Sequence, residues 1–138
     1  MLQFLLAKMT WKGRKIKVNN KIYQMDLKKV YDLLVNKALR KGRHKEEVDE
    51  LICWLTGYRK DELSACLEQS LTYADFFQRA PAFNYSCAKN IKGRICGIKI
   101  EEIEEEIMWK IRCLDKLIDE LAKGKSVSAI IHQYEGEE

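Results

Sequence analysis

Hydrophobic positions recur along this chain at intervals of three and four residues, the spacing that places side chains on one face of a helix. The longest such stripe predicts a helix over residues 101–123 and comprises Ile100, Ile103, Ile107, Ile111, Leu114, Ile118 and Leu121. Shorter stripes predict helices over residues 26–41, 45–55, 61–69, 72–80 and 126–134. Helical periodicity therefore accounts for most of the sequence.

Residues that start and stop helices fall between these stripes. Gly42, Gly57 and Gly124 each follow a predicted helix, and glycine commonly closes a helix in the left-handed conformation. Thr72 and Ser126 stand at two predicted starts, where a hydroxyl accepts a hydrogen bond from an unpaired backbone N–H. The boundaries of the predicted helices thus have a chemical basis as well as a periodic one.

These elements predict a mainly α fold, a single compact domain of five or six helices over residues 21–134. Isoleucines that alternate with other residues predict a short β-hairpin near residues 91–100. Residues 1–20 form a basic lead-in that we expect to be mobile, and residues 135–138 form an acidic tail. A length of 138 residues, 46% of them hydrophobic, suits one domain with its own core.

The cysteines and the N-terminus bear on localisation. The chain has five cysteines, an odd number without a CxxC pair, which is typical of reduced thiols rather than a disulfide framework. The apolar N-terminal run is interrupted at Lys8 and falls far short of the ~20 residues that a membrane span needs. We therefore expect a cytoplasmic protein that does not associate with membranes.

Three blocks of sequence occur in order along the chain: IYQMDLKKVYDLLVNKALRKGRHKEEVDELICWLTGY, YADFFQRAP and GRICGIKIEEIEEEIMWKIRCLDKLIDELAKGK. Over residues 22–132 they resemble the bacterial domain-of-unknown-function family 2200. The resemblance implies a small cytoplasmic domain with no assigned activity. It therefore carries over no functional residues.

The chain departs from that family pattern at three places. His44 stands where the family usually has threonine, and loss of the capping hydroxyl should cost about 1 kcal/mol of helix stability. Glu105-Glu106 replaces an Asp-Pro, so we expect the long helix to start earlier here. Asn84-Tyr85-Ser86 replaces an Asn-Pro-Asn turn.

The net charge of +4 conceals an asymmetry along the chain. Residues 1–60 carry fifteen Lys/Arg and six Asp/Glu, whereas residues 61–138 carry ten and fifteen. A basic half is suited to phosphates or an acidic surface. The alternative is that the two halves neutralise each other within the fold or between subunits.

Basic residues flank a glycine four times, at residues 12–14, 41–43, 92–94 and 123–125. Glycine lets a phosphate approach the backbone while flanking cations neutralise it. Alternatively, two of these triplets simply follow helices, whose C-terminal ends favour cations. Convergence on one face would favour nucleic-acid binding. The candidate binding residues are Lys41, Arg43, His44, Lys92, Arg94, Lys123 and Lys125.

Cys96 is the candidate nucleophile, because Arg94 lies two residues before it and a cationic, accessible setting lowers a thiol pKa. Only His44 and His132 exist in the sequence to serve as a base. Free cysteine is commonly buried, so we expect Cys96 to be a small buried residue of a strand. A thiol enzyme or redox protein using Cys96 is therefore the alternative function.

The sequence lacks the closely paired Cys and His spacings of zinc sites and has no cofactor-binding loop, so we expect neither a metal nor a cofactor. Trp109 lies partly off the apolar stripe and could anchor a partner or a homodimer formed through helix 101–123. We therefore expect a non-enzymatic binding module with a basic face, whose partner is nucleic acid or another protein.

Overall fold

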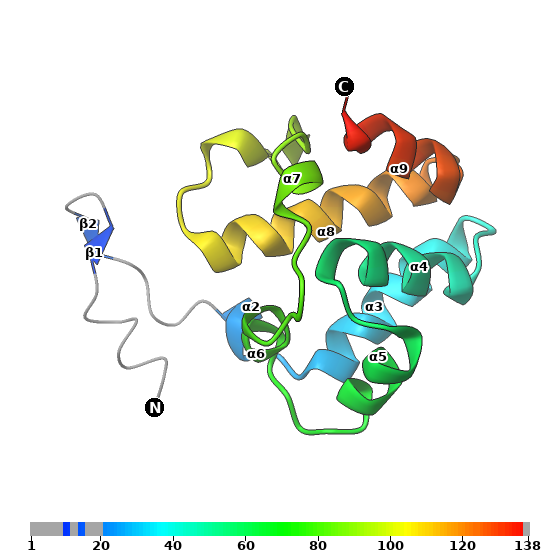
Figure 1. Ribbon diagram of the computed structural model, residues 1–138, viewed down its shortest axis with the longest axis horizontal. Helices are drawn as coiled ribbons and strands as arrows, with labels where there is room; N and C mark the ends of the chain where they lie inside the picture. The colour runs from blue at the N-terminus through cyan, green and yellow to red at the C-terminus, as the bar shows by residue number, and fades with distance from the viewer. Residues whose placement is uncertain (1–9, 12–13, 16–20, 137–138) are drawn as a thin grey trace.

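One central helix organises the described part of the chain. The computed structural model describes residues 10–11, 14–15 and 21–136. Around α8 (Glu106–Ala122) pack four other helices: α3 (Leu27–Arg40), α4 (Lys45–Thr56), α6 (Tyr73–Gln78) and α9 (Val127–Glu135). Figure 1 shows α8 crossing the molecule, with α3 and α4 on one side and α9 folded back beside its end. The predicted mainly α fold is confirmed.

Shorter elements complete the structure. They are α2 (Lys21–Gln24), α5 (Lys60–Leu67), α7 (Tyr85–Ala88), the 3-10 helix η1 (Ile100–Glu102), and strands β1 (Thr10–Trp11), β2 (Arg14–Lys15), β3 (Arg94–Ile95) and β4 (Ile98–Lys99). Of the eight α-helices in the described ranges, five have more than six residues. The sequence pattern missed α2 and α7 because a four-residue helix is too short to show a hydrophobic period.

The apolar stripe predicted on the long helix is the centre of the core. Ile111, Leu114, Ile118 and Leu121 are each 0–1% exposed. Burying a side chain of this size contributes about 1.5–3 kcal/mol. Because this face of α8 is covered by the chain's own helices, a homodimer through helix 101–123 would have to use the polar side of α8. That dimer remains a prediction.

The long helix begins at Glu106, so the expectation of a start at residue 101 is wrong. Ile100 is fully buried, and its N–H donates to the Gly93 carbonyl at 2.9 Å, which holds this stretch against the β3–β4 hairpin. Glu105 has an extended backbone and is the N-cap residue of α8, without a capping hydrogen bond from its side chain. Glutamates four residues apart, such as Glu101 and Glu105, would also repel one another in a helix.

The ends of α4 depend on backbone geometry at His44 and Gly57. The His44 N–H donates to the Glu47 carboxylate at 2.9 Å, so the acidic half of a capping box persists without the threonine hydroxyl. Gly57 closes α4 with φ +82°, and its N–H donates to the Cys53 carbonyl at 2.9 Å. A Cβ on Gly57 would meet the Ala82 oxygen at 2.6 Å. Glycine is therefore required there by both conformation and space.

Two predicted caps are confirmed. The Thr72 hydroxyl accepts a hydrogen bond from the Asp75 N–H at 3.1 Å, and the Ser126 hydroxyl accepts one from the Ala129 N–H at 3.1 Å. Each satisfies one backbone donor that has no partner within its helix. Local sequence therefore defines the starts of α6 and α9.

The predicted hairpin near residues 91–100 is confirmed as β3 and β4, paired antiparallel with Ile95 opposite Ile98. Cys96 and Gly97 form its two-residue turn with φ values of +53° and +77°, the pattern of a type I′ turn. Cys96 is exposed, so the expectation that it is buried is wrong. Since Ile95 points into the core, the next residue leaves it and enters the turn.

The chain ends are described only in part. Strands β1 and β2 pair antiparallel, and the rest of the predicted mobile lead-in, residues 1–20, lies outside the described residues. Helix α9 continues to Glu135, one residue into the predicted acidic tail 135–138, which is described as far as Gly136. No helix in the described part of the chain combines the length and apolar character needed to cross a membrane.

Candidate functional site

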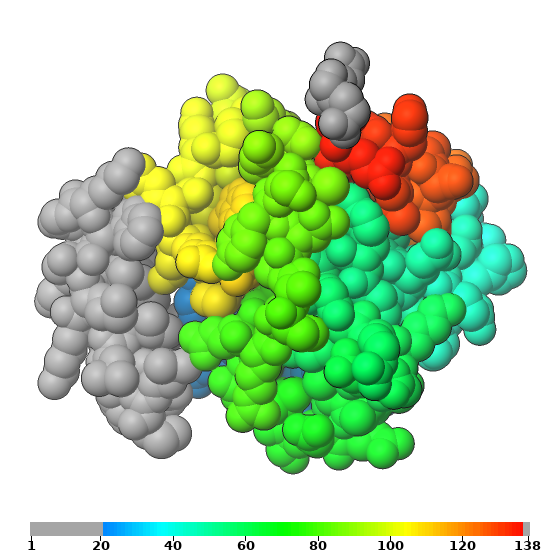
Figure 2. Space-filling model, viewed as in Figure 1, coloured from blue at the N-terminus to red at the C-terminus, as the bar shows by residue number. Residues whose placement is uncertain are grey.

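Helices α3 and α8 run in the same direction and end side by side. Lys37 Nζ lies 3.3 Å from Asp119 Oδ1, and the Arg43 Nη2 group donates to the Lys125 carbonyl at 3.3 Å. Both contacts join residues 82 positions apart, which is possible only if the two segments advance together. The α3–α4 turn therefore lies against the α8–α9 turn, as the adjacent cyan and red regions of Figure 2 illustrate.

Two of the basic triplets meet at this edge of the molecule. We call the side chains that gather here the basic surface: Lys37, Arg40, Lys41, Arg43, Lys123 and Lys125. Asp119 and Glu47 lie among them, so six cations against two carboxylates leave a formal charge of +4. A hollow of about 560 Å³ opens between Lys37, Arg40, Lys41, Asp119, Ala122 and Lys123.

The two carboxylates are held by cations that remain partly exposed. Asp119 lies 3.3 Å from Lys37 and 3.0 Å from Lys123. Partial burial alone would raise the pKa of Asp119, but hydrogen bonds from the two ammonium groups outweigh it and lower that pKa. Arg40 and Lys41 are exposed and make no ion pair with any residue that the structure describes. Their charge is therefore available to a ligand.

The basic triplet at residues 92–94 is not part of this surface. The Arg94 carbonyl accepts a hydrogen bond from Lys116 Nζ at 3.2 Å, and Lys116 lies two helical turns before Lys123. The Glu101 carboxylate accepts the Gly93 N–H at 2.9 Å, and this contact, followed by the nearby lysines, lowers the pKa of Glu101. Lys92 thus has an acidic neighbour of its own, while the Arg94 guanidinium donates to the Gly97 carbonyl at 3.4 Å. Lys12 and Gly13 lie outside the described residues.

The remaining predicted residues are His44 and Cys96. His44 is exposed at the start of α4, next to Arg43. Cys96 is exposed at the tip of the hairpin, whereas Cys113 is buried and desolvation raises its pKa to about 12. Within the described ranges, no group of three or more His, Cys, Asp or Glu side chains is placed to hold a metal ion. The thiol-based alternative remains a prediction.

A second cluster, which sequence reasoning did not find, lies near the start of α8. Lys110 Nζ is 2.9 Å from Glu106 Oε2, and the Tyr85 hydroxyl donates to the same oxygen at 2.6 Å. The ammonium also lies over the Phe83 and Tyr85 rings, 4.7 and 5.0 Å from their centroids. The spacing of Glu106 and Lys110 signals a helical ion pair. Nothing in the sequence indicates that the segment before α7 crosses over this ion pair.

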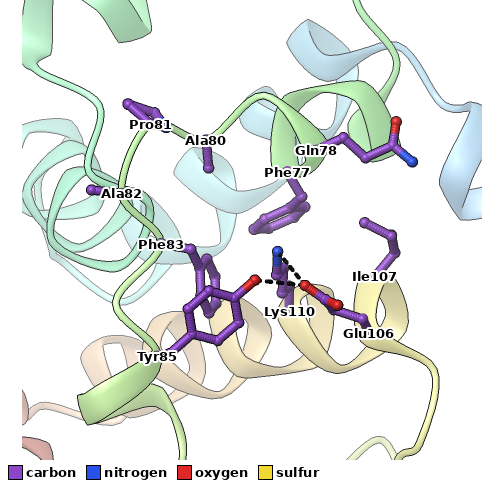
Figure 3. A pocket seen from close by; sticks show the side chains of 10 residues that line it. All are labelled: Phe77, Gln78, Ala80, Pro81, Ala82, Phe83, Tyr85, Glu106, Ile107 and Lys110. Atoms are coloured by element: carbon purple, nitrogen blue, oxygen red, sulfur yellow. Dashed lines mark hydrogen bonds and ion pairs between the residues drawn. The ribbon is translucent and has the colours of Figure 1, made fainter.

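This cluster lines an open pocket of about 530 Å³, shown in Figure 3. The side chain of Lys110 is only 7% exposed, whereas that of Glu106 is 58% exposed. Burial by itself would lower the pKa of Lys110, but hydrogen bonds with Tyr85 and Glu106 raise it overall. Hydrogen bonds from Tyr85 and then Lys110 lower the pKa of Glu106. Both groups therefore stay charged at neutral pH.

Residues from two segments meet in this pocket. Tyr85 is the first residue of α7, and Glu106 is the first residue of α8. The Tyr85 hydroxyl donates to Glu106 Oε2 at 2.6 Å. Trp109 is half-buried and stacks on Tyr85 with a centroid separation of 6.2 Å. Its predicted role as a partner anchor remains untested.

Comparisons with known proteins agree with one another. The profile of a family described as "Uncharacterized protein conserved in bacteria (DUF2200)" matches residues 21–132. The chain is also similar to a solved structure, the crystal structure of uncharacterized protein SP1917, with 42% sequence identity and a TM-score of 0.83. That match covers 87% of this chain and 98% of the other. No curated protein matches.

Proposed function

The chain belongs to the DUF2200 family, described as uncharacterized protein conserved in bacteria, and from its surface chemistry we propose that it binds nucleic acid. The basic surface at the joined ends of α3 and α8 contacts the phosphate backbone. The protein acts as a binding module rather than as an enzyme at this surface.

The observation that carries this proposal is the contact between Arg43 and the Lys125 carbonyl. It joins two basic-glycine-basic triplets that are 82 residues apart in the chain. Both turns are open at their glycines, since a Cβ added to Gly42 or Gly124 would meet no atom within 4 Å. A phosphate can therefore approach the backbone at both turns while cations on each side neutralise it.

A structural role explains only part of this charge. Lys41 and Lys123 follow the last helical residues of α3 and α8, where cations favour the negative ends of the helix dipoles. Two adjacent helix ends, each equivalent to about half a negative charge, require roughly one cation for balance. The basic surface has a formal charge of +4 after its two carboxylates are counted. The excess supports an external anionic partner.

The test measures binding of a fluorescein-labelled DNA duplex by anisotropy between about 50 and 200 mM salt. We expect affinity to fall linearly on a logarithmic plot against salt, because each contacted phosphate releases counterions. The double substitution Lys41→Gln and Lys123→Gln should reduce the slope by about 1.8, which corresponds to two lost contacts. Both side chains are exposed, so the fold is preserved.

The matched control is the double substitution Lys60→Gln and Lys89→Gln, which removes the same net charge from exposed residues at the start of α5 and the end of α7. Its slope should stay close to that of the wild type. Equal reductions of the salt slope in the two double variants would show that overall charge, not this surface, drives binding. Absence of salt-dependent binding would refute the proposal.

A second arm separates nucleic acid from an acidic protein partner. Poly-L-glutamate, added as a competitor at equal charge, presents carboxylates without phosphates. We expect the duplex to resist displacement, because cations flanking an open backbone suit phosphate oxygens. Displacement by poly-L-glutamate at equal charge would contradict nucleic-acid binding and favour an acidic protein instead.

A further inference from the structure

The pocket at the start of α8 offers a second binding site that does not depend on the basic surface. Lys110 and Lys123 are separated by about 20 Å of helix, since each residue rises about 1.5 Å. The pocket volume of about 530 Å³ falls within the range of small-molecule sites. We infer that this pocket binds a free α-amino acid with an apolar side chain, in its zwitterionic form.

The first argument comes from the paired charges at the floor of the pocket. Lys110 is a buried cation and Glu106 an adjacent anion, with Nζ and Oε2 2.9 Å apart. A ligand carrying only a negative charge is attracted by Lys110 and repelled by Glu106, and a cationic ligand meets the reverse. A free α-amino acid has an ammonium group and a carboxylate group attached to the same carbon, so it satisfies both Glu106 and Lys110.

The second argument is that each group keeps a contact for the ligand. The Tyr85 hydroxyl and Lys110 both bond to Glu106 Oε2, so Oε1 has no hydrogen-bond partner among the described residues. That oxygen accepts a hydrogen bond from the ligand's ammonium group. The Lys110 ammonium has three N–H groups; Glu106 and the Tyr85 hydroxyl account for two, and the third faces only aromatic rings, which are weak acceptors. It donates to the ligand's carboxylate.

The third argument is the character of the walls. Figure 3 shows the Phe77 and Phe83 rings and the Ile107 side chain around the space above Lys110 and Glu106. Phe77 is 1% exposed and Phe83 is 9% exposed, so these rings are fixed by the core. Fixed apolar walls beside two fixed charges are the arrangement of a pre-formed small-molecule site. The walls receive the apolar side chain of the amino acid.

The test compares three ligands by isothermal titration calorimetry: L-phenylalanine, N-acetyl-L-phenylalanine and L-phenylalanine amide. The acetylated compound lacks the ammonium group and the amide lacks the carboxylate, so each keeps one charge, as a peptide terminus does. We expect L-phenylalanine to bind at least tenfold more tightly than either, which corresponds to about 1.4 kcal/mol. Glycine, which lacks the side chain, should bind more weakly than L-phenylalanine.

Substitutions locate the binding. Glu106→Gln keeps the shape of an exposed side chain and should weaken L-phenylalanine binding at least tenfold, and Lys110→Met should do the same. The matched controls, Glu102→Gln and Lys116→Met, make the same chemical changes outside the pocket and should leave binding unchanged. If Lys110→Met fails to fold, Glu106→Gln decides the question alone.

Three results would overturn the inference. The first is the absence of L-phenylalanine binding at millimolar concentration. The second is that either capped analogue binds as tightly as L-phenylalanine, which would mean that a single charge or a peptide terminus is sufficient for binding. The third is unchanged binding in Glu106→Gln. None of these results bears on DNA binding at the basic surface, so the two proposals fail independently.

Discussion

Replacing Gly57 by alanine tests the closest approach that a Cβ would make at any glycine the structure describes. Gly57 has φ +82°, and a Cβ there would lie 2.6 Å from the Ala82 oxygen and 2.8 Å from the Ala82 nitrogen. These are backbone atoms, and they are held in place because the Ala82 N–H donates to the Thr56 carbonyl at 3.3 Å. The Asn84 N–H is held similarly by the Leu55 carbonyl at 2.8 Å. The clash therefore cannot be relieved by rotating a side chain.

The expected cost has two parts. A left-handed conformation costs an L-residue about 1–2 kcal/mol, and forcing an extra methyl group into a packed site costs about 1–3 kcal/mol. Gly57→Ala should therefore lower the free energy of unfolding by about 2–5 kcal/mol. Because Ala82 leads into Phe83 and Tyr85, the same change should also disturb the pocket above Lys110.

Gly42→Ala is the matched control. Gly42 has φ +78°, but a Cβ there would meet nothing within 4 Å. It should lower the free energy of unfolding by about 1–2 kcal/mol, from the conformational part alone. Urea unfolding followed by far-UV circular dichroism measures both variants. Equal costs for Gly57→Ala and Gly42→Ala would refute the reasoning, because the contact with Ala82 would then contribute nothing.

Four further predictions concern helix capping, the hairpin turn, thiol reactivity and alkaline pH. His44→Thr should raise the free energy of unfolding in urea by about 1 kcal/mol by restoring a capping hydroxyl, and no gain would argue against that cap. Cys96→Asn should stabilise the chain by about 1 kcal/mol or less, since asparagine tolerates the positive φ of a type I′ turn; a loss in the same assay would contradict the turn geometry. In the native protein, a thiol reagent should label exposed Cys96 quickly and buried Cys113 only after unfolding, as mass spectrometry would show; early labelling of Cys113 would be inconsistent with its burial. Desolvation and then the hydrogen bond to Asp49 raise the pKa of Tyr31 to about 12. The contribution of Tyr31 to the free energy of unfolding should therefore be complete below about pH 10 and lost as the pH rises through 12. Tyr31→Phe should reduce this loss of stability at alkaline pH, as melting temperatures measured against pH would show.

The sequence predicted the helices that are long enough to show a period. The stripe from Ile111 to Leu121 is buried as expected, and the caps at Thr72 and Ser126 form. The start of α8 was misplaced because the stripe continues to Ile100 although the backbone does not stay helical. A hydrophobic period reports which side chains are buried. It does not report which backbone conformation buries them.

The candidate sites were predictable only in part. The basic triplets at Lys41 and Lys123 are visible as sequence, but their separation of 82 residues hides the contact between them. The pocket beside Lys110 was not foreseen, since Phe83 and Tyr85 belong to a segment with no helical period. Exposure of Cys96 was also missed, because burial of a cysteine in a hairpin depends on which residues form the turn.

The sequence alone determined the helical content, several helix ends and the imbalance of charge between the two halves, because these follow from neighbours a few residues apart. Tertiary structure alone decided that α3 and α8 end together and that the segment before α7 crosses the start of α8. The physical reason is that such contacts depend on how buried faces pack over long separations. The spacing of hydrophobic residues within one segment does not show which other segment will pack against it.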